Sequence, residues 1–267
     1  MLKIALIQMN AGLDKQKNME KAVFFVNQAI RHQARFILLP EVFVFRGPMT
    51  HANLRQVMEP IPGDTTRIFM ALARKYRVHI LLGSIYEKSP TPSKAYNTSV
   101  LINDRGKIAG TYRKQHLFEA VLGKQQIKES RYFLAGNTAT VRTVCGFKVG
   151  LSVCFDVRFP RLYQTYKKQN VEIICIPSAF AQKTGQSHFE VLVRARAIEG
   201  LCYVLAPDQV GSDYNGGRMY GKSLVVDPWG KILVQGSASK EEILYAHLDK
   251  KIISDKRTIL STVLKKE

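Results

Sequence analysis

The chain has 267 residues and a formal net charge of +19, with 46% hydrophobic and 23% charged residues. These proportions are ordinary for a globular protein, and no apolar run approaches the ~20 residues that a membrane-spanning helix needs. The four cysteines have no CxxC spacing, which argues against a disulfide framework or a structural zinc site. The polar residues early in the N-terminal segment argue against a signal peptide. We therefore expect a cytoplasmic protein with free thiols.

The positive charge would attract anionic substrates or nucleic acid. The Lys and Arg residues are scattered along the chain, however, and no basic stripe with interleaved aromatic residues is visible. A solvated basic surface is the preferred interpretation. Non-catalytic nucleic-acid binding is kept as the alternative from a different class of function.

Strands and amphipathic helices alternate along the chain. In the first half the expected elements are a strand at 3–9, a helix at 16–33, a strand at 35–40, a helix at 64–76, a strand at 78–86, a β-hairpin at 97–114 and a loop-rich stretch at 115–140. In the second half they are a strand at 148–155, a helix at 160–169, a strand at 171–177, a helix at 187–199, a strand at 201–207 and a hairpin at 223–236.

These assignments depend on the spacing of apolar residues in the helices and on turn residues in the hairpins. Ser187 and Glu190 have the spacing of a capping box and predict the start of the last helix. Because the hairpins interrupt the alternation and the strands look buried on both faces, we expect a mixed α/β sandwich. No linker or repeat divides the chain, so 1–267 is predicted to form a single domain.

Three predicted strands end in a reactive side chain. Glu41 follows an apolar strand and Pro40, Lys114 ends the first hairpin, and Cys154 follows the apolar run before it. Strand ends commonly position functional groups at an open edge of a sheet. A thiolate nucleophile, a cation that lowers its pKa or holds an oxyanion, and a carboxylate that carries a proton form a complete set for acyl transfer.

Each residue also has a structural interpretation. Cysteine is often buried as a small apolar residue, which suits Cys175, Cys202 and, less clearly, Cys145. Cys154 differs because charged residues follow it at once. Taken alone, the acid would be a helix N-terminal residue and the lysine a surface residue.

The histidines give no comparable signal. No local pattern ties His116 or His188 to the cysteine, so we expect both to be structural. The ligand spacing typical of a metal site is absent from the sequence, and neither a metal nor an organic cofactor is expected.

The chain resembles the nitrilase superfamily of carbon–nitrogen hydrolases over nearly its whole length. The similar segments are LLPEVF, which contains Glu41, YRKQHLF, which contains Lys114, and GLSVCFDVRFP, which contains Cys154. A further glutamate that the family places between the lysine and the cysteine corresponds to Glu129 in IKESRYFLAG. Together these motifs are far more specific than any one of them.

The second half resembles the Nit branch, through PSAFAQKTGQSHFEVLVRARAIEG and YGKSLVVDPWGKIL. That branch hydrolyses small ω-amides, with deaminated glutathione amidase and ω-amidase (acting on 2-oxoglutaramate) as its main activities. Departures from the usual pattern are Phe155 for tyrosine, Phe189 for tryptophan and Lys222 for histidine. None of them removes a catalytic group, but they leave the exact substrate open.

The resemblance implies a four-layer α-β-β-α sandwich that pairs into a homodimer through the helices beginning at Pro160 and Ser187. It also implies cleavage of a small carboxylate-bearing ω-amide through a cysteine thioester, with release of ammonia. A nitrilase or an N-carbamoyl hydrolase with the same three groups is the alternative within the enzyme class.

The resemblance also assigns roles to the candidate residues. Cys154 would attack the carbonyl carbon while Glu41 takes and returns the proton, and Lys114 with the backbone N–H of Phe155 would hold the oxyanion. Glu129 would position the lysine or the substrate nitrogen. Arg158 is expected either to bind a substrate carboxylate or to form a structural ion pair with Asp156 or another acid.

Overall fold

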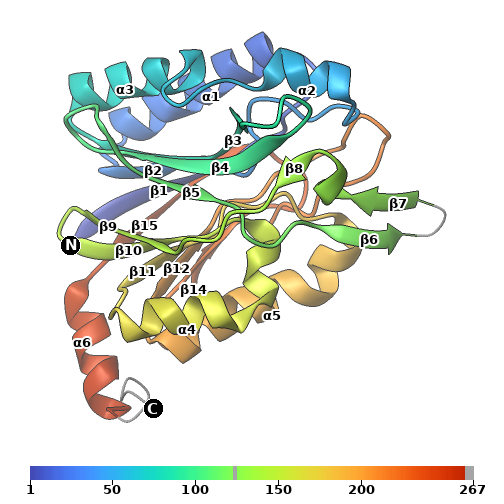
Figure 1. Ribbon diagram of the computed structural model, residues 1–267. Helices are drawn as coiled ribbons and strands as arrows, with labels where there is room; N and C mark the ends of the chain where they lie inside the picture. The colour runs from blue at the N-terminus through green and yellow to red at the C-terminus, as the bar shows by residue number, and fades with distance from the viewer. Residues whose placement is uncertain (123–124, 262–267) are drawn as a thin grey trace.

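Two β-sheets lie face to face in the computed structural model, which describes residues 1–122 and 125–261 (Figure 1). Helices cover the outer face of each sheet, so the layers follow the expected α-β-β-α order. The covering helices are α1 (Lys15–Arg31), α2 (His51–Val57) and α3 (Asp64–Tyr76) on one side and α4 (Pro160–Lys168) and α5 (Gln182–Gly200) on the other. None of the helices within the described ranges is long and apolar enough to cross a membrane.

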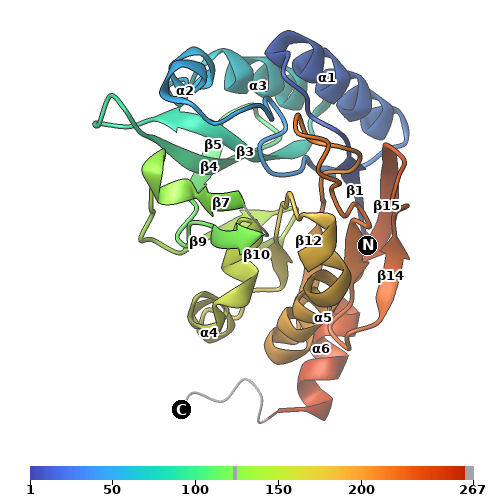
Figure 2. The ribbon, with the colours of Figure 1, turned by 90° about the vertical axis from the view of Figure 1, so that its right-hand side faces the viewer.

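The first sheet has seven strands in the order β15-β1-β2-β3-β4-β5, with β8 beside β4. Its strands are β1 (Leu2–Gln8), β2 (Phe36–Leu38), β3 (His79–Lys88), β4 (Ala95–Ile102), β5 (Ile108–Arg113), β8 (Phe133–Leu134) and β15 (Glu242–Leu248). The first and last strands of the chain pair antiparallel and lie side by side (Figure 2).

The second sheet has six strands in the order β14-β13-β12-β11-β10-β9. Its strands are β9 (Thr140–Val144), β10 (Phe147–Leu151), β11 (Ile173–Cys175), β12 (Tyr203–Ala206), β13 (Leu224–Val226) and β14 (Ile232–Gln235). The remaining elements are the hairpin of β6 (Glu119–Leu122) and β7 (Gln125–Lys128), the 3₁₀ helices η1 (Glu129–Arg131) and η2 (Cys154–Arg158), and the C-terminal helix α6 (Lys250–Ile259).

Side-chain alternation along β1 shows why the layers stack in this order. Ile4 and Leu6 belong to the core that the two sheets share, whereas Ala5 and Ile7 belong to the core under α1 and α3. Successive side chains of a strand point to opposite faces, so a strand that is apolar on both faces must be covered twice. All four side chains are fully buried.

The predicted elements are largely confirmed, but the structure contains additional short elements and some boundaries differ. The stretch 115–140, expected to be loop-rich, contains β6, β7, η1 and β8, and residues 123–124 of it lie outside the described residues. The elements α2, β9, β15 and α6 were not predicted. The strand expected at 148–155 ends at Leu151, because Cys154 already belongs to a 3₁₀ turn.

Helix α5 begins at Gln182, five residues before the expected start at Ser187. Its N-cap is Ala181, without a side-chain cap, so the predicted capping box is wrong. Phe189 packs inward and is fully buried, whereas the side chains of Val191 and Ile198 on the other face are 67% and 46% exposed. One of the two apolar faces predicted for this helix is therefore covered and the other is open.

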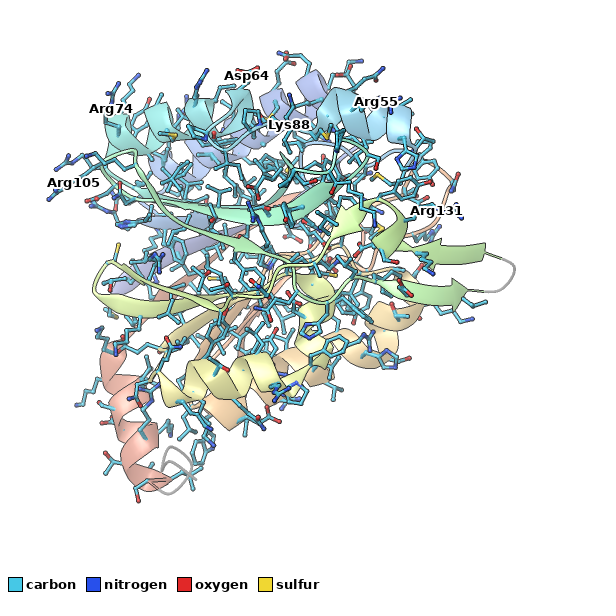
Figure 3. The ribbon with its side chains drawn as sticks, in the orientation of Figure 1. Arg55, Asp64, Arg74, Lys88, Arg105 and Arg131 are labelled. Carbon is cyan, nitrogen blue, oxygen red and sulfur yellow. The ribbon has the colours of Figure 1, made fainter. Side chains whose placement is uncertain are left out.

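Charged side chains project from the surface of several separate elements (Figure 3). Arg55 lies on α2, Arg74 on α3, Arg105 in the β4–β5 turn and Arg131 at the end of η1. The basic residues are thus spread over the surface, as the sequence suggested.

Candidate active site

Glu41 lies just beyond the end of β2 and is 4% exposed. Its backbone is fixed on both sides, because its N–H donates to Ser178 O at 3.3 Å and its carbonyl accepts from Gln209 Nε2 at 2.8 Å. Its carboxylate oxygen Oε1 accepts hydrogen bonds at 2.9 Å from both Asn97 Nδ2 and Lys114 Nζ. The acid is therefore held with one defined orientation in the interior.

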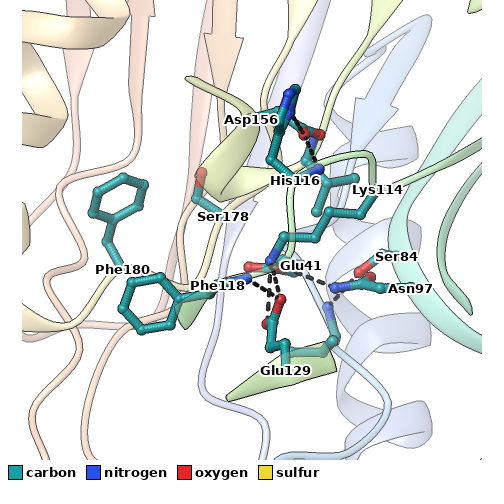
Figure 4. Close-up of polar contacts among 12 residues, drawn as sticks. Glu41, Ser84, Asn97, Lys114, His116, Phe118, Glu129, Asp156, Ser178 and Phe180 are labelled. Atoms are coloured by element: carbon teal, nitrogen blue, oxygen red, sulfur yellow. Dashed lines mark hydrogen bonds and ion pairs between the residues drawn. The ribbon is translucent and has the colours of Figure 1, made fainter. Parts of the chain in front are cut away.

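Lys114 follows β5, and its side chain is 1% exposed. Nζ lies 2.9 Å from Glu41 Oε1 and 3.0 Å from Glu129 Oε2, so the ammonium group lies between two carboxylates (Figure 4). Burial by itself would lower the pKa of Lys114, but the carboxylates of Glu129 and Glu41 outweigh it and raise the pKa well above its usual value. The two carboxylates therefore favour the charged form of this buried lysine.

Glu129 begins η1, and its side chain is 22% exposed. Besides Lys114, it accepts a hydrogen bond at 2.7 Å from the backbone N–H of Phe118. Burial raises the pKa of Glu129, although Lys114 acts in the opposite direction. Glu129 thus gives the lysine a second carboxylate partner besides Glu41.

Cys154 is the first residue of η2, three residues beyond β10, and is 9% exposed. Its backbone has φ of +46°, and its N–H donates to Pro177 O at 2.9 Å. This left-handed conformation is costly for a residue with a Cβ. It turns the chain out of the strand direction, which places the thiol in a tight turn instead of at the strand end that the sequence predicted.

The Cys154 thiol is influenced by the groups described above. Burial raises its pKa well above the usual value, and Glu41 adds to this effect. Lys114 and a hydrogen bond from the backbone of Ala179 lower the pKa, but they do not compensate fully. These effects favour the neutral thiol, which needs a nearby base to attack a carbonyl.

Asp156 forms hydrogen bonds both within the turn that contains Cys154 and with the loop that follows Lys114. It is fully buried, and Oδ2 accepts hydrogen bonds from Val153 N–H at 2.9 Å and Tyr112 Oη at 2.8 Å. Oδ1 accepts from the backbone N–H of His116 at 2.9 Å and lies 2.8 Å from its Nδ1. The His116 ring also stacks on Phe159, so this histidine is structural, as expected.

Phe155 follows the cysteine in η2 and is half-buried. Its backbone N–H makes no hydrogen bond within residues 1–122 and 125–261. A free N–H next to the sulfur is what an oxyanion site needs. The ring lies edge-to-face against Phe118, with 5.1 Å between centroids.

Arg158 ends η2 and does not form the ion pair with Asp156 that was one of its two expected roles. The hydrogen bonds of Asp156 come from other groups, and no carboxylate among the described residues pairs with the guanidinium. Its Cζ lies 5.6 Å from the ring centroids of both Phe155 and Phe180, and Nη2 lies 3.2 Å from Nδ1 of His188. Nε is buried without a hydrogen-bond partner in the described part of the chain.

The structure brings Glu41, Lys114 and Glu129 into direct contact, and Cys154 is close enough for Glu41 and Lys114 to act on its pKa. Arg158 lies beside Phe155, the residue after the cysteine. The structure also adds several residues that the sequence analysis missed. Asn97 and Gln209 orient Glu41, and Asp156 connects two loops of the site. A buried asparagine in an apolar strand (AYNTSVLI) and an Asp-Gln pair directly after VLAP were visible signals. The other cysteines lie away from this group: Cys175 and Cys202 are buried, as expected, whereas Cys145 is exposed, contrary to the structural interpretation.

Comparison with known proteins identifies the class. Residues 3–257 match the model of the carbon–nitrogen hydrolase family, so the chain belongs to that family, as the motifs predicted. It is 38% identical over 242 residues to deaminated glutathione amidase from Mus musculus, an alignment that covers 88% of this chain and 74% of the mouse protein.

Two solved structures share the fold. The Caenorhabditis elegans NitFhit protein has a TM-score of 0.91 and 31% identity, covering 100% of this chain and 65% of that longer one. Nit3 of Saccharomyces cerevisiae, a member of branch 10 of the nitrilase superfamily, has a TM-score of 0.86 and 32% identity, covering 97% of this chain and 94% of that chain. This chain therefore spans less than two thirds of NitFhit but nearly all of Nit3.

Proposed function

We propose that the protein hydrolyses a small, carboxylate-bearing ω-amide of the deaminated glutathione or 2-oxoglutaramate type through a thioester on Cys154. The observation that carries this proposal is the buried cluster in which Glu41 and Lys114 are hydrogen-bonded and both act on the pKa of the Cys154 thiol. The name of the mouse relative supports the substrate class.

In the acylation step the neutral thiol gives its proton to Glu41 as the sulfur attacks the amide carbon. The carbonyl oxygen becomes an oxyanion that accepts hydrogen bonds from Lys114 and from the Phe155 N–H. Glu41 then passes the proton to the nitrogen as the carbon–nitrogen bond breaks, which releases ammonia and leaves a thioester. Loss of one oxyanion donor typically costs ~10²–10³ in rate.

In the deacylation step Glu41 takes a proton from a water molecule as the water oxygen attacks the thioester carbon. The same two donors hold the second oxyanion, and the sulfur leaves as its proton returns from Glu41. Glu129 contributes by holding Lys114, because its carboxylate stays beside the ammonium group while Glu41 carries the proton.

Substrate selection is assigned to Arg158. A guanidinium group between two aromatic rings, with a buried Nε that lacks a partner in the described residues, is suited to a carboxylate. Replacing Arg158 by methionine should raise KM for 2-oxoglutaramate by about tenfold or more, the loss of a charge-assisted hydrogen bond. KM for a neutral amide of similar size should change little. Equal changes for both substrates would contradict this role.

Ammonia release from ω-amides, N-carbamoyl compounds and nitriles tests the proposal. We expect turnover of the anionic ω-amides that is abolished in Cys154→Ala and in Glu41→Gln, and kept in the control Cys145→Ala, which removes an exposed thiol. Residual turnover by Cys154→Ala would refute the thioester mechanism. Preference for a nitrile or an N-carbamoyl substrate would refute the substrate class and leave the mechanism intact.

A homodimer is also proposed, with the open apolar face of α5 as part of its interface. Val191 and Ile198 are exposed there, and a second copy of the chain would cover them. We place the protein in the cytoplasm, a location that its four free cysteines support. Sedimentation of the purified protein and fractionation of cells expressing it test the two statements.

A further inference from the structure

One short segment contacts both the candidate nucleophile and the candidate base. We call residues 177–180 the bridging segment. Pro177 O accepts the N–H of Cys154 at 2.9 Å, and Ser178 O accepts the N–H of Glu41 at 3.3 Å. The backbone of Ala179 adds a hydrogen bond to the Cys154 sulfur that favours the thiolate. A displacement of this segment would therefore move both reacting groups.

Asp208 holds the bridging segment in place. Its side chain is fully buried, and Oδ1 accepts hydrogen bonds at 2.9 Å from the backbone N–H groups of Phe180 and Gln209. Residue 208 also forms a parallel β-bridge with Ser178, and its own N–H donates to Ser223 Oγ at 2.7 Å. Both the main chain and the side chain of Asp208 thus fix the segment, part of which is visible beside Glu41 in Figure 4.

The surroundings of Asp208 favour a neutral carboxyl group. Within the described residues Oδ2 has no hydrogen-bond partner, and no cation forms an ion pair with this side chain. A buried carboxylate without a cation is strongly disfavoured. Burial accordingly raises the pKa of Asp208 well above its usual value, and Glu41 raises it further. Two backbone hydrogen bonds and Arg46 lower this pKa, but their effect is smaller.

A neutral Asp208 also suits the chemistry of the cluster. An anion at this position would raise the pKa of Cys154 further, and so would oppose the attack that Glu41 promotes. We propose that Asp208 is a positioning residue whose carboxyl oxygen holds the bridging segment, and with it the backbone of Ala179, in place against Cys154. This inference rests on the proposed function in one respect only, namely that Cys154 is the nucleophile.

Two variants separate hydrogen bonding from charge. Asp208→Asn keeps an oxygen acceptor of the same size without a charge, whereas Asp208→Ala removes the acceptor. We expect the alanine variant to lose about tenfold in kcat, with KM nearly unchanged, because a positioned hydrogen bond is lost. The asparagine variant should stay within about threefold of the wild type.

The second measurement is the rate at which 4-vinylpyridine, which contains no amide group, alkylates Cys154, followed by mass spectrometry of its peptide. This rate needs no amide substrate, so it distinguishes failure of this inference from failure of the proposed function. We expect it to fall in the alanine variant and to be restored in the asparagine variant, with the Cys145 peptide unchanged as the internal control.

Two results would overturn the inference. One is an alanine variant with lower stability to urea but unchanged kcat and Cys154 alkylation, since that pattern describes a purely structural residue. The other is a folded asparagine variant as impaired as the alanine variant, since that pattern means an ionised carboxylate is required. If the alanine variant does not fold, the asparagine variant alone tests the inference. Retained activity of that variant supports a neutral Asp208, and lost activity refutes it.

Discussion

Replacing Lys114 by methionine should destabilise the protein in a strongly pH-dependent manner. The ammonium group is 1% exposed and lies 2.9 Å from Glu41 and 3.0 Å from Glu129. Removing one partner of a buried ion pair costs about 3–5 kcal/mol, because the remaining charge is left without compensation. Here two carboxylates would remain. At alkaline pH we therefore expect the free energy of unfolding to fall by about 3–5 kcal/mol or more.

The sign of the pH dependence follows from the pKa of Glu129. Burial already raises this pKa, and Lys114 is what lowers it. Without the lysine, the pKa in the folded protein rises further above its unfolded value of about 4.3. The folded variant then binds a proton that the unfolded chain has lost, so its stability falls as pH rises through this window. The penalty should be smallest near the unfolded pKa and should grow as pH rises above it.

Urea unfolding at several pH values measures the penalty directly. Lys88→Met, at an exposed position, is the matched control and should change stability by less than about 0.5 kcal/mol. Adding Glu129→Gln to the Lys114 variant should recover part of the loss at high pH. A penalty that is equal at about pH 5 and about pH 8 would refute the reasoning, because it would show that no carboxylate takes up a proton.

Three further substitutions test other parts of the structure. Tyr112→Phe removes a buried hydrogen bond of 2.8 Å to the Asp156 carboxylate and should lower the free energy of unfolding by about 1.5–3 kcal/mol in urea titrations; an unchanged value would contradict the buried bond. Gly83→Ala would place a Cβ against the carbonyl oxygens just before Glu41, so kcat should fall more than KM rises, and normal kinetics would exclude this close contact. Val191→Glu should yield a monomer in sedimentation if α5 forms the interface, and an intact dimer would place the interface elsewhere.

Periodic signals in the sequence predicted most strands and helices and a mixed α/β sandwich, whereas the four-layer order was implied by the resemblance to the family. The helix predicted at 64–76 coincides with α3, and the hairpin predicted at 223–236 with β13 and β14. The missed elements lack such signals. Strand β9 (TVRTV) has two exposed residues within five, and α6 is rich in lysine, so neither presents a clear apolar face.

The site was predictable as a set of residues but not as a geometry. Motif resemblance selected Glu41, Lys114 and Cys154 without placing any of them. At the left-handed turn the N–H of Cys154 donates to the carbonyl oxygen of Pro177, which lies on a different segment of the chain. Contacts between segments far apart in the chain leave no mark in local spacing, so the supporting residues emerged only from the structure.

The high pKa of the buried thiol also bears on how the protein withstands oxidants. Peroxide attacks thiolates and reacts slowly with neutral thiols. Cys154 is 9% exposed and held neutral by burial and by Glu41, so it is a poor target for peroxide between turnovers. In the proposed mechanism its nucleophilic form arises as the proton passes to Glu41. We therefore expect Cys154 to react with peroxide more slowly than a thiol of ordinary pKa does.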